Sequence, residues 1–153
     1  MKQFLFHCGT RDSTASFGIF MFRVMIGLMM LIGHGIPKIE KFSALKEGFY
    51  VPDIFPFAYM SSAVSLSACI AAEVGAAALI VLGLATRPAA FILGFTMVVA
   101  AFGKYGGADW FGSGKEMAIL YLISMIGIIL TGAGSISIDS RLYKEGRRLR
   151  MLI

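Results

Sequence analysis

Four stretches of this chain are long and apolar enough to cross a lipid bilayer, and they limit its fold more than any other feature. A membrane-spanning helix needs about 20 mostly apolar residues, and about 17 suffice where the helix tilts or the bilayer thins. The stretches cover residues 17–36, 63–84, 88–103 and 117–133. The sequence therefore predicts an all-α integral membrane protein built as a four-helix bundle.

The composition agrees with a membrane protein and argues against other classes. Of the 153 residues, 58% are apolar and 15% are charged, whereas soluble domains carry about 25% charged residues. Cys8 and Cys69 are the only two cysteines, so a disulfide scaffold is excluded. The length allows a single membrane domain over residues 1–153.

The connections between the stretches predict the topology. Residues 85–87 form a short turn before Pro88, so the second and third helices should make an antiparallel hairpin. The connection over residues 37–62 is much longer, and we expect a short interfacial helix around Ile39–Lys46. Trp110 and Phe111 resemble membrane-interface anchors. The expected architecture is up-down-up-down with one long outer loop between helices 1 and 2.

The basic residues predict the orientation. Eight lie on the side of the two termini, five of them in a basic tail over residues 140–153, and five lie on the opposite side. The positive-inside rule then places both termini in the cytoplasm, in the cytoplasmic (inner) membrane of the cell. Because the tail follows a membrane span, we expect it to meet anionic lipid and not nucleic acid.

Two charged residues lie within the predicted spans, where charge is costly. At 1.5 Å per residue, Glu73 lies ~17 Å from the cytoplasmic end of its helix, near the bilayer midplane, and Arg23 only ~9 Å. Either Arg23 pairs with Glu73, or Glu73 is protonated within a polar layer. The difference in depth favours protonation of Glu73, and we therefore expect the Glu73→Gln variant to fold nearly normally. That layer would hold Glu73, Thr96, Tyr121 and Ser124.

One face of the first helix carries a stripe of residues three or four positions apart: Arg23, Gly27, Met30, His34 and Lys38. His34 could hydrogen-bond a quinone carbonyl or shuttle a proton, or it could be an interfacial histidine bonded to the backbone. Glu116, in the first turn of the fourth helix, suits the helix dipole and could reach Lys38.

The remaining chemistry is sparse. With two histidines, His7 and His34, a haem held by two imidazoles from facing membrane helices is excluded. The chain has no C-x-x-C, no P-loop and no G-x-S-x-G motif. We therefore expect no catalytic residue and no metal site, and no redox chemistry by this chain alone.

These motifs in this order resemble the DoxX family of small bacterial and archaeal membrane proteins. The resemblance spans residues 17–139 and includes Phe22-Arg23-x3-Gly27-x6-His34-Gly35-x2-Lys38, Ala72-Glu73-x-Gly75, Leu82-Gly83-Leu84-x-Thr86-Arg87, Lys115-Glu116 and Gly132-x-Gly134-x2-Ser137-x-Asp139. It implies a four-helix membrane protein, in some members linked to quinone-dependent oxidation of sulfur compounds or to redox-stress complexes with soluble partners. By position it also implies one functional cavity formed by Arg23, His34, Lys38, Glu73, Arg87 and Glu116.

Three functions fit the sequence. The chain could be a membrane subunit that binds a quinone near His34, Lys38 and Glu73 while a partner carries the redox centre. It could be a small permease or proton-coupled carrier in which Glu73 titrates. It could also be a scaffold that docks soluble redox proteins through its tail or outer loop.

The predicted orientation has a direct test. Single cysteines placed at Asp53 and Ser113 should react with a membrane-impermeant thiol reagent from outside the cell, since both loops lie opposite the termini. Labelling of both positions from the cytoplasm alone would reverse the assignment.

Overall fold

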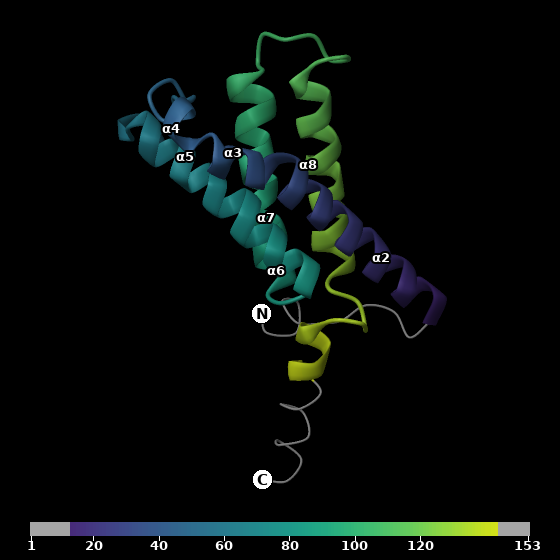
Figure 1. Cartoon of the computed structure of the whole chain (residues 1–153). Helices are drawn as coiled ribbons and strands as arrows, with labels where there is room; N and C mark the ends of the chain where they lie inside the picture. Colours follow the sequence, from purple (N-terminus) through teal and green to yellow (C-terminus); the bar gives the residue numbers. More distant parts are fainter. Residues whose placement is uncertain (1–12, 144–153) are drawn as a thin grey trace.

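The computed structural model describes residues 13–143, and within them it is helical without strands. Four helices are long and apolar enough to span a membrane, and Figure 1 shows them alternating in direction. This confirms the predicted all-α, four-helix membrane architecture. Cys8, His7 and the part of the predicted basic tail beyond Tyr143 lie outside the described residues. The four spans are Ser13–Glu40, Ser62–Leu82, Thr86–Lys104 and Gly114–Thr131.

The first span is longer than predicted. It comprises α2 (Ser13–Met30), the π-helical η1 (Leu31–Gly35) and α3 (Ile36–Glu40), so it continues past the expected end at residue 36. Pro37 has no N–H to donate and its ring clashes with the carbonyl one turn back. The wider turn of η1 lies just before it, and Pro37 falls in the first turn of α3, where proline is tolerated.

The other three spans follow the predictions within a few residues. The second contains α5 (Ser62–Ile70), the π-helical η3 (Ala71–Ala76) and α6 (Ala77–Leu82). The third contains α7 (Thr86–Val98) and the π-helical η4 (Val99–Lys104), and the fourth is α8 (Gly114–Thr131). The Ser61 and Ser113 hydroxyls accept hydrogen bonds from backbone N–H groups at the starts of α5 and α8.

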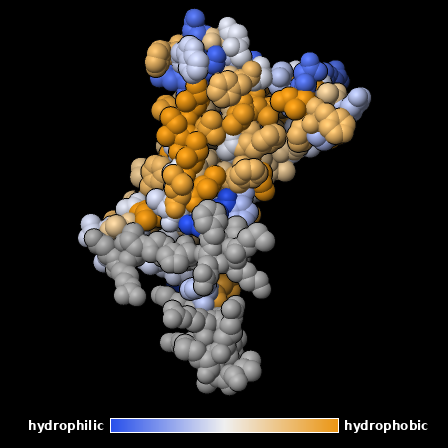
Figure 2. Space-filling view, turned by 180° about the vertical axis from the view of Figure 1, so that it is seen from behind, coloured by the Kyte–Doolittle hydropathy of each residue, from blue (hydrophilic) through white to orange (hydrophobic). Residues whose placement is uncertain are grey.

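The helices pack unevenly. α7 and α8 lie side by side, whereas α2 crosses the bundle obliquely and packs on α6 (Figure 1). The buried core between them contains Met30, Ile80, Leu93, Met125 and Ile128. Figure 2 shows a broad hydrophobic band over the face in view, with hydrophilic residues gathered beyond it. This is the surface expected of a protein whose sides face lipid.

The two ends of the bundle differ in construction. The loop end carries the connections over residues 41–61 and 105–113, with α4 (Phe42–Leu45) and a short 3₁₀ helix, η2 (Phe57–Tyr59). α4 lies within the predicted interfacial helix at Ile39–Lys46. Trp110 is exposed as expected of an anchor, and its ring lies 4.6 Å from the ammonium of Lys115.

The opposite end, which we call the turn end, is closed by Arg23. The chain reverses between α6 and α7 at Gly83, whose φ is +71°. Arg23 is 1% exposed, and its guanidinium donates to the carbonyls of Ile80 and Val81 in the last turn of α6. It also donates to Ile136 after α8, at 3.0 Å. Carbonyls in the last turn of a helix lack the N–H group four residues on, and that of Ile80 accepts from the Gly83 N–H at 3.2 Å as well as from Arg23.

Asp139 completes the turn end. Its two carboxylate oxygens accept from the N–H groups of Ala85 at 2.8 Å and Thr86 at 3.0 Å, at the start of α7. Its own N–H donates to the Gly83 carbonyl at 2.9 Å. A carboxylate is well placed here, because the N-terminus of a helix carries unpaired donors and partial positive charge.

Replacing Gly83 with alanine should destabilise the bundle by about 2 kcal/mol or more. Alanine at this position would keep a backbone φ of +71°, which is strained for a residue with a side chain. Its Cβ would also lie 2.5 Å from Arg23 Nη1 and 2.7 Å from Ser137 Cβ. Gly18→Ala is the control, since a Cβ there meets nothing within 4 Å and alanine favours a helix. Thermal unfolding in detergent should show a loss for Gly83→Ala alone, and equal stability of the two variants would contradict this account.

Candidate functional site

A cavity of about 400 Å³ lies in the half of the bundle next to the loop end. Residues from all four spans and from the long loop line it, and most are apolar or aromatic. One side is buried and includes Met30, Met97 and Ala118, whereas the other side includes the exposed α7 residues Phe91 and Ile92. The cavity therefore reaches from the core to the lipid-facing surface.

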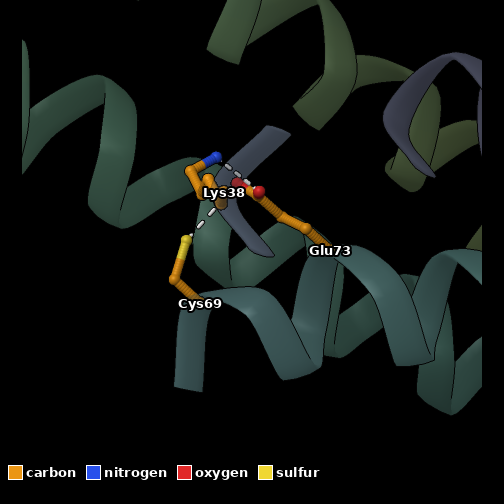
Figure 3. A network of polar contacts seen from close by, with 3 residues as sticks. All are labelled: Lys38, Cys69 and Glu73. Carbon is orange, nitrogen blue, oxygen red and sulfur yellow. Dashed lines mark hydrogen bonds and ion pairs between the residues drawn. The ribbon is translucent and has the colours of Figure 1, made fainter. Parts of the chain in front are cut away.

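A polar cluster of Lys38, Cys69 and Glu73 lines this cavity (Figure 3). The Lys38 ammonium forms an ion pair with Glu73 Oε2, and the Cys69 thiol donates to Oε1 at 3.4 Å. The side chain of Glu73 is 6% exposed and that of Lys38 20%. Lys38 is therefore the cation that compensates the intramembrane carboxylate.

Two features of the backbone bring Lys38 to Glu73. Gly35 lies so close to η3 that a Cβ there would be 2.7 Å from Val74 and 3.2 Å from the Glu73 carbonyl oxygen. The absence of a side chain lets η1 and η3 approach, as small residues do between membrane helices. The continuation of the helix through Pro37 then places Lys38 three residues further along, level with Glu73.

Each of the three π-helical segments carries one polar residue that lines the cavity. These are His34 in η1, Glu73 in η3 and Lys104 in η4. π-Helical turns are rare and often occur at functional sites, because an extra residue in a turn redirects the side chains around it. Their gathering around one cavity marks it as the candidate site.

His34 meets an aromatic partner from the opposite side of the bundle. Its imidazole ring and the phenol ring of Tyr121 in α8 are T-shaped, with centroids 5.3 Å apart. Both residues line the cavity. An edge-to-face arrangement is a favourable geometry for two aromatic rings, and it fixes the position of both.

Aromatic residues also surround the exposed side of the cavity. Phe57 of η2 packs on Phe95 of α7, with ring centroids 5.7 Å apart. The Lys104 ammonium lies over the rings of Phe49 and Tyr105, at 5.6 and 5.2 Å. The long loop therefore forms part of the cavity wall.

The structure does not gather all six predicted site residues. His34, Lys38 and Glu73 line the cavity. Arg23 binds carbonyls at the turn end and does not pair with Glu73, which excludes the less favoured of the two alternatives for Glu73. The pair with Lys38 was not among those alternatives. Arg87 lies at the start of α7 at that same end, and Glu116 accepts from the Gly112 N–H at 2.7 Å instead of reaching Lys38.

The predicted polar layer around Glu73 is also incorrect in part. Thr96 and Ser124 donate to carbonyls of their own helices, Ile92 and Leu120, at 3.1 and 2.9 Å. A hydroxyl four residues after a helical carbonyl has this local partner available wherever it lies. Thr96 and Tyr121 still line the cavity.

The sequence analysis missed several residues of the site. Cys69 was not among the predicted site residues, although its spacing of four residues before Glu73 is a signal for contact on one helix face. Lys104 was not among the predicted site residues either, and it lines the cavity. Nothing in the sequence pointed to Tyr50 or Phe57, which arrive from the long loop.

Comparison with known proteins agrees with these motifs. The profile of a family described as DoxX matches residues 18–105, which is more than half of the chain. An uncharacterized protein of Haemophilus influenzae is 35% identical over 78 residues. That match covers 48% of this chain and 58% of the relative. No solved structure matches the chain.

The ion pair changes the expected behaviour of Glu73 variants. Glu73→Gln should destabilise the bundle by about 3 kcal/mol, because it leaves the Lys38 ammonium without its carboxylate. Lys38→Met should cost a similar amount, and the double variant less than the sum of the two. Thermal unfolding in detergent measures these differences. Glu116→Gln is the control and should change stability by less than about 0.5 kcal/mol, and additive losses at Lys38 and Glu73 would refute the pair.

Proposed function

This chain belongs to the DoxX family, and from that premise we propose that it binds a quinone in the cavity beside Lys38 and Glu73. We propose further that it is a membrane subunit of a quinone-linked redox system whose redox centre lies on a partner protein. The observation that carries the proposal is an apolar, aromatic cavity with one group of charged and hydrogen-bonding residues in its wall.

The size and walls of the cavity support an aromatic or quinoid ligand. Small-molecule sites usually have volumes of about 300–1,000 Å³ and mostly apolar walls with a few polar groups. The exposed residues Phe91 and Ile92 connect the cavity to the lipid side of α7, where an isoprenoid tail would remain in the bilayer. A ligand that dissolves in the membrane could therefore enter without crossing the headgroups.

The polar residues support a ligand with carbonyl oxygens. Lys38 and His34 offer N–H donors, and the Glu73 carboxylate holds the Lys38 ammonium in place. When bound, a quinone accepts two electrons and two protons in becoming a quinol. Lys38, Glu73 and His34 are the residues of this site that could hold or pass those protons. The sequence has two histidines and no C-x-x-C, which is why we assign the electron supply to a partner.

The remaining elements of the proposal concern placement in the cell. We place the protein in the cytoplasmic membrane as a single membrane domain with both termini in the cytoplasm. The basic residues after α8 would then lie near anionic lipid. A soluble redox protein is the proposed partner, docking at the membrane surface.

A lipid extract of the purified protein tests the proposal. Its mass spectrum should contain a quinone at a constant ratio to protein, and Glu73→Gln should lower that ratio at least tenfold, the effect of ~1.4 kcal/mol in binding. Glu116→Gln, a carboxylate outside the cavity lining, should leave the ratio unchanged. Absence of quinone from the wild-type extract and no binding of added quinone would reject the proposal. Solute uptake into liposomes that Glu73→Gln abolishes would favour the carrier function instead.

A further inference from the structure

Tyr121 is a buried side chain whose hydroxyl has no hydrogen-bond partner among residues 13–143. The residue is 5% exposed and lines the cavity, where its ring packs against that of His34. The hydroxyl oxygen is not fully enclosed by protein atoms, so it borders open space. The residue lines the cavity, which is the space open to a ligand next to this side chain.

Several of the polar side chains named above have partners within the chain, whereas the buried hydroxyl of Tyr121 has none among the described residues. Lys38, Cys69 and Glu73 bond to one another, and the hydroxyls of Thr96 and Ser124 bond to backbone carbonyls. Within the described part of the chain, the ring nitrogens of His34 also make no hydrogen bond. Buried polar groups in proteins nearly always have partners, so the unpaired hydroxyl of the buried Tyr121 is available to a ligand in the cavity.

We infer that the Tyr121 hydroxyl donates a hydrogen bond to one ring oxygen of the ligand, with His34 holding the phenol in place. This inference rests on the proposed function for the identity of the ligand as a quinone. A phenol is a donor of fixed direction once its ring is packed, and the T-shaped contact with His34 fixes this ring. Tyr121 is therefore a residue that distinguishes quinones from hydrocarbons of the same shape.

The discrimination follows from the burial of the donor. A site built to bond an oxygen binds an analogue without it poorly, because its own donor then remains unpaired. Removal of the donor removes the preference for the ligand that carries the oxygen, while the apolar walls continue to bind the ligand and its oxygen-free analogue. Tyr121→Phe deletes only the hydroxyl and keeps the ring that packs on His34.

The experiment compares duroquinone with durene, a hydrocarbon that has the same four methyl groups and no oxygen. Both are titrated against the purified full chain in lipid nanodiscs. Tyr121→Phe should weaken duroquinone binding about tenfold, the usual effect of one lost hydrogen bond, and leave durene binding unchanged. Tyr59→Phe is the matched control and should change neither, since Tyr59 is 85% exposed and does not line the cavity.

The infrared carbonyl bands of bound duroquinone give a readout that a purely structural role would not move. In the wild type one band should lie at lower frequency, as expected of a hydrogen-bonded carbonyl, and in Tyr121→Phe it should return to the unbonded position. Equal losses for duroquinone and durene, or unchanged bands and affinity in Tyr121→Phe, would overturn the inference while leaving the proposed function intact. Failure of the wild type to bind duroquinone would overturn both.

Discussion

Backbone carbonyls at the end of a membrane helix lack helical N–H partners, and Arg23 donates to carbonyls of this kind at the turn end. A guanidinium presents several donors in a fixed plane, so one side chain can serve two carbonyls of α6 and one after α8. Asp139 serves the N–H groups at the start of α7 in the same place. The first, second and third spans and the segment after α8 are thereby joined at one point.

The tight turn end explains why the cavity lies at the other end. The α6–α7 hairpin and the chain after α8 are held together at Gly83, Arg23 and Asp139, while α5 leans away from α7 toward the loop end (Figure 1). Aromatic residues of the long loop fill part of the space between these helices, where Phe57 packs against Phe95. What remains is a cavity with a buried side and a lipid-facing side.

Two pairs of charged residues in the bundle have different roles. Arg23 and Asp139 bond to backbone groups and hold helix ends, so their contribution is structural. Lys38 and Glu73 bond to one another in a cavity wall, where a ligand can compete for either. A buried ion pair contributes little net stability in exchange for its desolvation, which suits a site more than a scaffold.

The sequence by itself determined the class of fold, because helices that cross a bilayer must be long and apolar, and the four stretches were visible at residues 17–36, 63–84, 88–103 and 117–133. It also marked His34, Lys38 and Glu73 as polar residues of interest.

The sequence could not decide the partners of these residues. The stripe on the first helix included Lys38 but did not predict its pairing with Glu73, whereas the oblique first span continues through a π-helical turn and Pro37 to bring Lys38 to Glu73. Arg23, assigned to a functional cavity by its position in the motif, instead bonds carbonyls from segments more than 50 residues away. Helix tilt, the rotation that a π turn introduces and the course of the long loop depend on packing between distant segments, and only the tertiary structure decided them.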